Sequence, residues 1–204
     1  RSEDWLYKMF GIDAELLIDH AWGYETCRMS DIKNYHSEEH SLSNGQVLMR
    51  NYSFDEALVI VREMTDNLVL DLFEKGLVTS SLTLWIAYDH RYEHEASKGT
   101  VKLERESNSS KKIIDAVEDL YLRIADRYTG IRRIEVCANR VAPESYVQYS
   151  LFDDPKQTDK ERHLQEAVLN VKQRYGKNAI MRGSNLLECS TYRERNEQIG
   201  GHRA

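Results

Sequence analysis

Cysteine, proline and long apolar runs are all scarce in this chain of 204 residues. The three cysteines, Cys27, Cys137 and Cys189, are odd in number and widely spaced, which argues against a disulfide framework and favours a reducing cytoplasm. No apolar stretch approaches the ~18 residues of a membrane span, and no basic segment followed by an apolar one opens the chain. We therefore expect a cytoplasmic protein without a membrane partner.

An excess of positive charge is also missing. The formal net charge is -6, whereas a nucleic-acid-binding protein is expected to show a basic footprint, so the composition does not by itself predict one. The hydrophobic content of 41% is enough for a core of ordinary size.

Motifs of catalysis and metal binding are absent as well. There is no Ser/His/Asp or Cys/His set and no phosphate-binding loop, so no catalytic residue is predicted. Asp89, His90 and His94 lie close together in the sequence, but no cysteine or further carboxylate is placed at ligand spacing. We interpret this stretch as a solvated loop, treat His36 and His40 in the same way, and predict no metal site.

Residues 41–143 read as a strand-helix-strand unit written twice. In each copy the apolar period changes from about two to about 3.6 and back. The first copy is SLSNGQVLMRN, SFDEALVIVREMTDNLVLDLFEKG and SSLTLWIAYDH, and the second is GTVKLERES, NSSKKIIDAVEDLYLRIADRYTG and IRRIEVCANRV. This order predicts an α+β protein with the ferredoxin-like split βαβ fold, βαββαβ, in which two helices cover one face of a four-stranded antiparallel sheet.

Each predicted helix has recognisable ends. Ser53 and Glu56 have the spacing of a capping box, and Gly76 follows as a stop signal. Ser109 or Ser110 should open the second helix and Gly130 should close it. The second helix should bury one apolar stripe, formed by Ile113, Val117, Leu120, Ile124 and Tyr128.

The flanking segments have a different character. Residues 1–24 predict two short helices around Gly11, and residues 25–40 are polar and aperiodic, as in a tether. The two prolines of the chain, Pro143 and Pro155, bracket a segment that should be extended and exposed, so residues 144–158 are interpreted as a linker. Thr158 with Glu161 forms a second capping box, which predicts a helical tail over residues 159–204.

The chain resembles the C-terminal part of a Y-family, UmuC-like translesion DNA polymerase. FGIDAELLIDHAWGYE is similar to the end of the thumb, the doubled unit to the little finger domain, and QYSLF, followed by a helix ending in RYG, to the clamp-binding tail. The closing ERNEQIGGH is similar to the UV-damage repair branch. The resemblance implies a protein that grips primer-template DNA during damage bypass and recruits the bacterial sliding clamp.

The resemblance also implies site residues. The open face of the sheet should contact DNA through small residues that admit a phosphate and through basic residues in or beside the strands, namely Ser41, Ser43, Gly45, Arg50, Lys102, Arg105, Arg132, Arg133 and Arg140. The clamp should bind an extended segment through an amide and adjacent apolar anchors, which here are Gln148, Ser150, Leu151 and Phe152.

The metal chemistry of the family has no counterpart in these residues. In the family, palm carboxylates hold two magnesium ions on the incoming nucleotide, and nothing in this sequence matches that motif. The palm would precede Arg1, so we expect Mg²⁺ there, no cofactor in residues 1–204, and no nucleotide incorporation by these residues alone.

Two alternatives remain open at this level. One is a non-catalytic ferredoxin-like module that binds nucleic acid or protein, and the other is an independent enzyme of the same fold. An RNA-binding sheet should carry stacked aromatics on its central strands. Trp85 and Tyr88 are the candidates there, but they are three positions apart and should face opposite sides of a strand.

Overall fold

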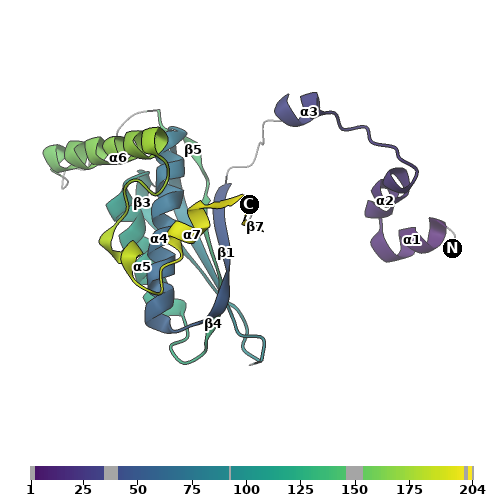
Figure 1. The fold of residues 1–204 in the computed structure, drawn as a ribbon, viewed down its shortest axis with the longest axis horizontal. Coiled ribbons are helices and arrows are strands. Elements are labelled where there is room, and N and C mark those ends of the chain that lie inside the picture. Colours follow the sequence, from purple (N-terminus) through teal and green to yellow (C-terminus); the bar gives the residue numbers. More distant parts are fainter. Residues whose placement is uncertain (1–2, 35–40, 92, 146–153, 200–201, 204) are drawn as a thin grey trace. The chain divides into compact units, whose positions relative to one another are not determined.

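The computed structural model describes residues 3–34, 41–91, 93–145, 154–199 and 202–203 (Figure 1). The chain divides into two compact units, residues 1–39 and residues 40–204. The first unit holds α1 (Glu3–Phe10), α2 (Asp13–Ala21) and α3 (Met29–Asn34). The helix pair around Gly11 is as predicted, whereas α3 lies in residues 25–40, for which the sequence predicts an aperiodic tether.

The second unit is built on a four-stranded antiparallel sheet. Its strands and covering helices follow in the order β1 (Ser41–Tyr52), α4 (Phe54–Glu74), β2 (Leu77–Tyr88), β3 (Ser97–Ser107), α5 (Ser110–Ile124) and β4 (Ile131–Asn139). In space the strand order is β1-β4-β2-β3, and a short β5 (Ala142–Pro143) pairs with the start of β2. Each helix therefore connects two parallel strands that are separated by a third, which confirms the predicted split βαβ fold.

The ends of α4 follow the predicted signals, and the end of α5 does not. Ser53 and Glu56 form the capping box, and Gly76 takes the positive φ of +62° that ends α4. Ser109 caps α5 through the amide of Lys112, but α5 ends at Ile124 and not at Gly130. Tyr128, predicted in the buried stripe of this helix, is 95% exposed because it lies beyond the helix end.

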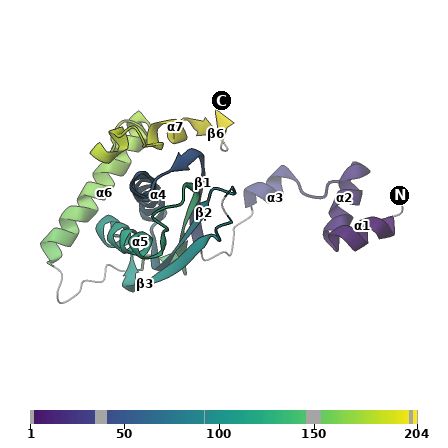
Figure 2. The same ribbon diagram turned by 90° about the horizontal axis from the view of Figure 1, so that it is seen from below.

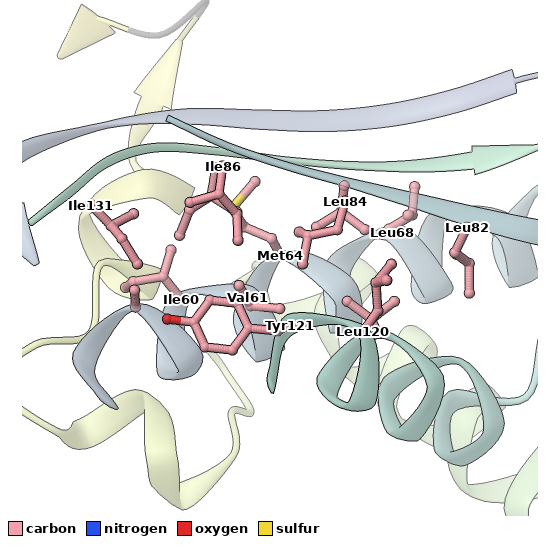
Figure 3. Close-up of a cluster of buried hydrophobic side chains, with 14 of the residues drawn as sticks. Ile60, Val61, Met64, Leu68, Leu82, Leu84, Ile86, Leu120, Tyr121 and Ile131 are labelled. Carbon is pink, nitrogen blue, oxygen red and sulfur yellow. The ribbon is translucent and has the colours of Figure 1, made fainter. Parts of the chain in front are cut away.

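The core fills the space between the sheet and the two helices. Figure 3 shows side chains of α4, β2 and α5 in contact there, including Met64, Leu84 and Tyr121, all of which are fully buried. Gly99 on β3 permits this close packing, because a Cβ atom at that position would lie 2.8 Å from Leu120 Cδ1. The two apolar helix stripes thus share one sheet face, as amphipathic helices require.

The C-terminal tail begins earlier than predicted. Its elements are α6 (Pro155–Tyr175), η1 (Gly183–Leu186), α7 (Tyr192–Asn196), β6 (Gln198–Ile199) and β7 (His202–Arg203). Asp154 caps α6 through the amide of Lys156, and Pro155 occupies the first turn, so the predicted capping box of Thr158 and Glu161 is wrong. Proline suits this position, because its fixed φ matches the helix and its missing N–H would have had no partner in the first turn.

The tail packs on the outer side of the helix layer (Figure 2) and, through Thr191 and Arg195, reaches Gln46 and Asn44 on the edge strand β1. Glu161 of α6 accepts hydrogen bonds from Ser109 Oγ (2.8 Å) and from the amide of Lys111 (2.9 Å) at the start of α5. The guanidinium of Arg182 pairs with Asp66 of α4 at 2.6 Å. Acidic and polar groups of the helix layer are therefore bound by the chain itself.

The described residues of the loop between β2 and β3 are exposed from His90 onward, as interpreted, but Asp89 at its start is buried. Asp89 is 3% exposed and accepts hydrogen bonds from Arg91 and, with a smaller effect, from Asn51, and these bonds lower its pKa. The ring of His94 contacts the ring of Tyr88 at a tilted angle, with centroids 4.3 Å apart. The described residues contain no group of three His, Cys, Asp or Glu side chains suited to a metal ion. In the same part of the chain, no helix is both long and apolar enough to cross a membrane.

Candidate nucleic-acid interface

One face of the sheet carries α4 and α5, and the other carries no helix within the described part of residues 41–199 (Figures 1 and 2). Strand side chains alternate between these faces. On β2, for example, Leu82, Leu84 and Ile86 are buried against the helices, whereas Thr83 and Trp85 are only half-buried on the other side. We call the helix-free side the open face.

The strand register arranges the open face in rows that run across the sheet. Each row combines one residue from β1, one from β4, one from β2 and, in three of the rows, one from β3. The rows are Val47, Arg133 and Ala87; Gly45, Glu135, Trp85 and Lys98; Ser43, Cys137, Thr83 and Thr100; and Ser41, Asn139, Ser81 and Lys102. Small polar side chains therefore dominate this surface.

The polar side chains of the open face are linked by hydrogen bonds. Asn139 Nδ2 donates to Thr83 Oγ1 (2.8 Å), and the hydroxyls of Thr83 and Thr100 are 2.9 Å apart. Cys137 Sγ donates to Asn139 Oδ1 (3.3 Å), and burial raises the pKa of the Cys137 thiol, with a smaller effect from Glu135. Together with Trp85 and their neighbours, these residues line a shallow hollow of about 430 Å³.

Charged side chains surround this polar centre. Lys98 and Lys102 are exposed on the edge strand β3. The guanidinium of Arg133 lies over the ring of Trp85, 5.1 Å from its centroid, and 3.4 Å from a carboxylate oxygen of Glu135. The open face thus has two lysines on its edge strand β3, and an arginine paired with a glutamate on the central strand β4.

The structure brings together five of the nine residues predicted to contact DNA. Ser41, Ser43 and Gly45 on β1, Lys102 on β3 and Arg133 on β4 all lie on the open face. These residues come from three strands, and the antiparallel register places them on the same face of the sheet.

The other four predicted residues lie elsewhere. Arg50 is on the helix side, where it pairs with Glu56 at 2.7 Å and covers the ring of Tyr52. Arg132 is the additional residue at the bulge of β4, because Ala87 pairs with Arg133 and Tyr88 pairs with Ile131. Arg105 lies where β3 leaves its register with β2, and Arg140 follows β4 with a φ of +50°.

Several open-face residues were missed by the sequence interpretation, among them Lys98, Thr83, Thr100 and Asn139. Strict alternation from Lys102 along the same strand would have placed Thr100 and Lys98 beside it, since they precede it by two and four positions. The opposite positions of Trp85 and Tyr88 are confirmed, since Tyr88 is buried under the sheet. The predicted clamp-binding residues, Gln148, Ser150, Leu151 and Phe152, lie outside the described residues.

Residues 39–151 match the impB/mucB/samB family C-terminal domain. This match covers more than half of the chain, so the chain belongs to that family. The domain is the little finger domain of the Y-family DNA polymerases. The family resemblance inferred from the sequence motifs is thereby confirmed.

Individual relatives are distant. DNA polymerase IV 2 of Bacillus subtilis (strain 168) is 25% identical over 203 residues, which are 98% of this chain and 47% of that protein. DNA polymerase IV 2 of Halalkalibacterium halodurans is 21% identical over 168 residues, or 82% of this chain and 40% of that protein. The chain therefore spans about half or less of the length of these relatives.

Solved structures that match the chain are less similar in sequence. A complex of the beta-clamp processivity factor and the little finger domain of PolIV is 12% identical, with a TM-score of 0.40, covering 56% of this chain and 100% of that one. A post-insertion binary complex of Dbh DNA polymerase is 14% identical, with a TM-score of 0.38, covering 70% of this chain and 40% of that one.

Proposed function

We propose that the open face binds primer-template DNA through its phosphates, as the little finger of a translesion DNA polymerase acting in damage bypass. The observation that carries this proposal is the composition of the rows. Small side chains such as Ser43, Gly45 and Thr100 let a phosphate backbone approach closely, and Lys98, Lys102 and Arg133 supply positive charge. In this proposal the two-metal chemistry of nucleotide incorporation belongs to a palm domain.

Contact with phosphates fits the open face better than base stacking does. A sheet that reads single-stranded RNA presents several aromatic rings on its central strands. Here the ring of Trp85 is already covered by Arg133, and Tyr88 is buried on the opposite side. We therefore expect little sequence preference and a strong dependence on salt concentration.

The test compares two pairs of lysine and arginine substitutions that remove equal charge from opposite sides of the domain. Lys98→Ala with Lys102→Ala removes two cations from the open face, and Lys111→Ala with Arg123→Ala removes two exposed cations from α5. Binding of a fluorescent primer-template hairpin is followed by anisotropy at several salt concentrations. The first pair should weaken binding at least about tenfold at 0.1 M salt and make the salt slope shallower by ~1.8, whereas the second should change little.

Two results would contradict this mode of binding. One is equal loss of affinity in both double variants, which would indicate that only the net charge matters. The other is a salt-independent affinity of the unsubstituted chain.

We propose in addition that residues 148–152, QYSLF, bind the hydrophobic pocket of the bacterial sliding clamp. The sequence supports this, since a glutamine amide precedes two large apolar anchors in a segment between prolines. The described residues on either side are held on the domain, because the amide of Glu144 donates to the carbonyl of Gly76 (2.8 Å), Glu144 pairs with Arg162 (2.7 Å), and Asp154 caps α6. Anchoring at both ends reduces the conformational freedom that binding must remove.

Calorimetry with purified clamp tests this partner. Replacing Leu151 and Phe152 by Ala should cost on the order of 3 kcal/mol, about a hundredfold in Kd, and should leave DNA binding unchanged. A matched control is Leu186→Ala with Leu187→Ala, which removes two apolar side chains that are exposed elsewhere in the tail. Equal clamp affinity in both double variants, or no binding by the unsubstituted chain, would rule out this segment as the clamp ligand.

A further inference from the structure

Glu135 occupies the middle of the open face. It lies on the central strand β4, between Gly45 of β1 and Trp85 of β2 in the same row. Its neighbour on β1 is Gly45, which has no side chain. A Cβ atom added there would lie 3.7 Å from Glu135 Cγ, so the glycine leaves this side of the carboxylate uncovered. A nucleic acid that crosses the open face must therefore pass over this carboxylate.

Glu135 is also the ion-pair partner of the one arginine that the register places on the open face. The guanidinium of Arg133 lies 3.4 Å from Glu135 Oε2 and 5.1 Å from the centroid of the Trp85 ring. Both groups reach the surface side by side, with Arg133 50% and Glu135 37% exposed. The carboxylate thus stands next to the guanidinium, on the surface that a phosphate would approach, and not underneath it as an orienting group would.

We infer that Glu135 limits the affinity of the open face for DNA by competing with phosphate for Arg133. This inference rests on the DNA-binding function proposed above. The ion pair between exposed side chains is weak, so a phosphate can displace the carboxylate from the guanidinium. The gain in binding free energy is smaller than that from a phosphate contact to an unpaired arginine, because the phosphate only replaces the carboxylate as the partner of the guanidinium.

The basic residues of β3 do not relieve this competition. Lys98 lies in the same row as Glu135, but Trp85 stands between them, so the two positions are two strand spacings or ~10 Å apart. That distance is comparable to the Debye length at 0.1 M salt, which leaves Lys98 only a small influence on the carboxylate. Glu135 therefore competes with phosphate for Arg133 but not for Lys98, or for Lys102 two rows further along the sheet. Weaker binding mainly shortens the lifetime of a complex, which suits a domain that must release DNA as synthesis advances.

The inference is tested by a gain of affinity in the full chain of 204 residues. With the same primer-template hairpin at 0.1 M salt, Glu135→Gln should bind about three- to tenfold more tightly, and its salt slope should be steeper by ~0.9, as expected for one additional phosphate contact. The control is Asp119→Asn, which makes the same charge change at an exposed position of α5. It should alter the affinity less than twofold.

A double-mutant cycle separates competition for Arg133 from general repulsion. In an Arg133→Ala background, Glu135→Gln should give less than a twofold gain, because the group for which it competes is gone. A gain of full size in that background would overturn the inference.

Other outcomes are equally decisive. If Glu135→Gln binds no more tightly, or more weakly, while Lys98→Ala with Lys102→Ala still reduces affinity, the inference is wrong and the proposed function stands. If the unsubstituted chain does not bind the hairpin at all, the proposed function fails, and the inference fails with it.

Discussion

The two faces of one sheet differ in almost every property except their backbone. On β2, Leu84 is fully buried against the helices, and its neighbour Thr83 faces solvent with a hydroxyl bonded to Asn139. The covered face uses large apolar side chains because it must fill space with α4 and α5. The open face uses small polar ones, which leave room for a ligand, so the difference separates the residues that maintain the fold from those available for binding.

The charges differ between the two sides as well. Acidic groups of α4 are bound by the tail, since Asp66 pairs with Arg182 and Glu63 accepts a hydrogen bond from the amide of Thr191. Lys98 and Lys102 instead project from the exposed edge of the sheet. A net charge of -6 is therefore a poor guide to this protein, because it averages two surfaces of different character.

The largest expected effect comes from the covered face. Leu84→Ala should reduce the free energy of unfolding by about 2–5 kcal/mol, through lost burial and the cavity left behind. Thr83→Ala, one residue away on the open face, should cost only about 1 kcal/mol or less, the value of an exposed hydrogen bond. Urea denaturation followed by circular dichroism measures both. Similar losses for the two variants would mean that the faces do not divide structure from function as described.

A smaller loss is expected from a polar group within the covered side. Tyr121 is fully buried, and its hydroxyl donates to the carbonyl of Phe54 (2.7 Å). Tyr121→Phe keeps the ring but removes this hydrogen bond to a carbonyl that also accepts a backbone bond within α4, which should cost about 0.5–1.5 kcal/mol. The same unfolding experiment tests it, and an unchanged stability would show that another donor replaces the hydroxyl.

The stability contributed by the junction between the helix layer and the tail should depend on pH. Burial raises the pKa of Glu63 above its ordinary value of 4.5, and the hydrogen bonds from Ser190 and Thr191 and the charge of Arg195 oppose this only in part. Because the folded-state pKa is the higher one, the neutral carboxyl favours folding below pH 4.5, and this stability is lost as the pH rises through the folded-state value.

Glu63→Gln removes this titration. As the pH rises above 4.5, the wild type should lose stability relative to the variant, as measured by urea unfolding at a series of pH values. Some dependence should remain in the variant, because burial also raises the pKa of Asp71 on the same helix. A difference between wild type and variant that stays constant over this range would contradict the assignment.

The smallest effect is expected at the end of β4. Arg140 has a φ of +50°, a conformation that costs energy for any residue with a Cβ atom. Arg140→Gly should therefore raise the free energy of unfolding by about 0.5–1 kcal/mol, whereas Arg140→Ala should give no such gain. A glycine variant that is less stable than the alanine variant would show that the backbone at this position is not strained.

Much of the fold could be predicted because its signals are local. The capping box of Ser53 and Glu56 and the stop at Gly76 are set by hydrogen bonds and backbone preferences within a few residues. The local signals predicted the wrong start of a helix where two capping motifs lie close together. Thr158 and Glu161 match a capping box, but Asp154 followed by Pro155 begins α6 one turn earlier, and Glu161 instead binds the start of α5.

The candidate site could be predicted only in part, because a basic residue near a strand can point to either face. Arg133 and Lys102 lie on the open face, whereas Arg50 bonds to Glu56 on the helix side. The bulge at Arg132 and the irregular end of β3 at Arg105 interrupt the alternation on which such a prediction depends.

The sequence by itself determined the kind and order of the elements, since hydrophobic periodicity and capping act within single segments of the chain. Only the tertiary structure decided which residues meet across the open face, because the register of β1, β4, β2 and β3 joins positions as distant as Gly45, Glu135 and Lys98. The same holds for the tail, whose contacts with α4 and α5 depend on side chains far apart in the sequence. Pairing between distant segments depends on the whole packed arrangement, and no local pattern encodes it.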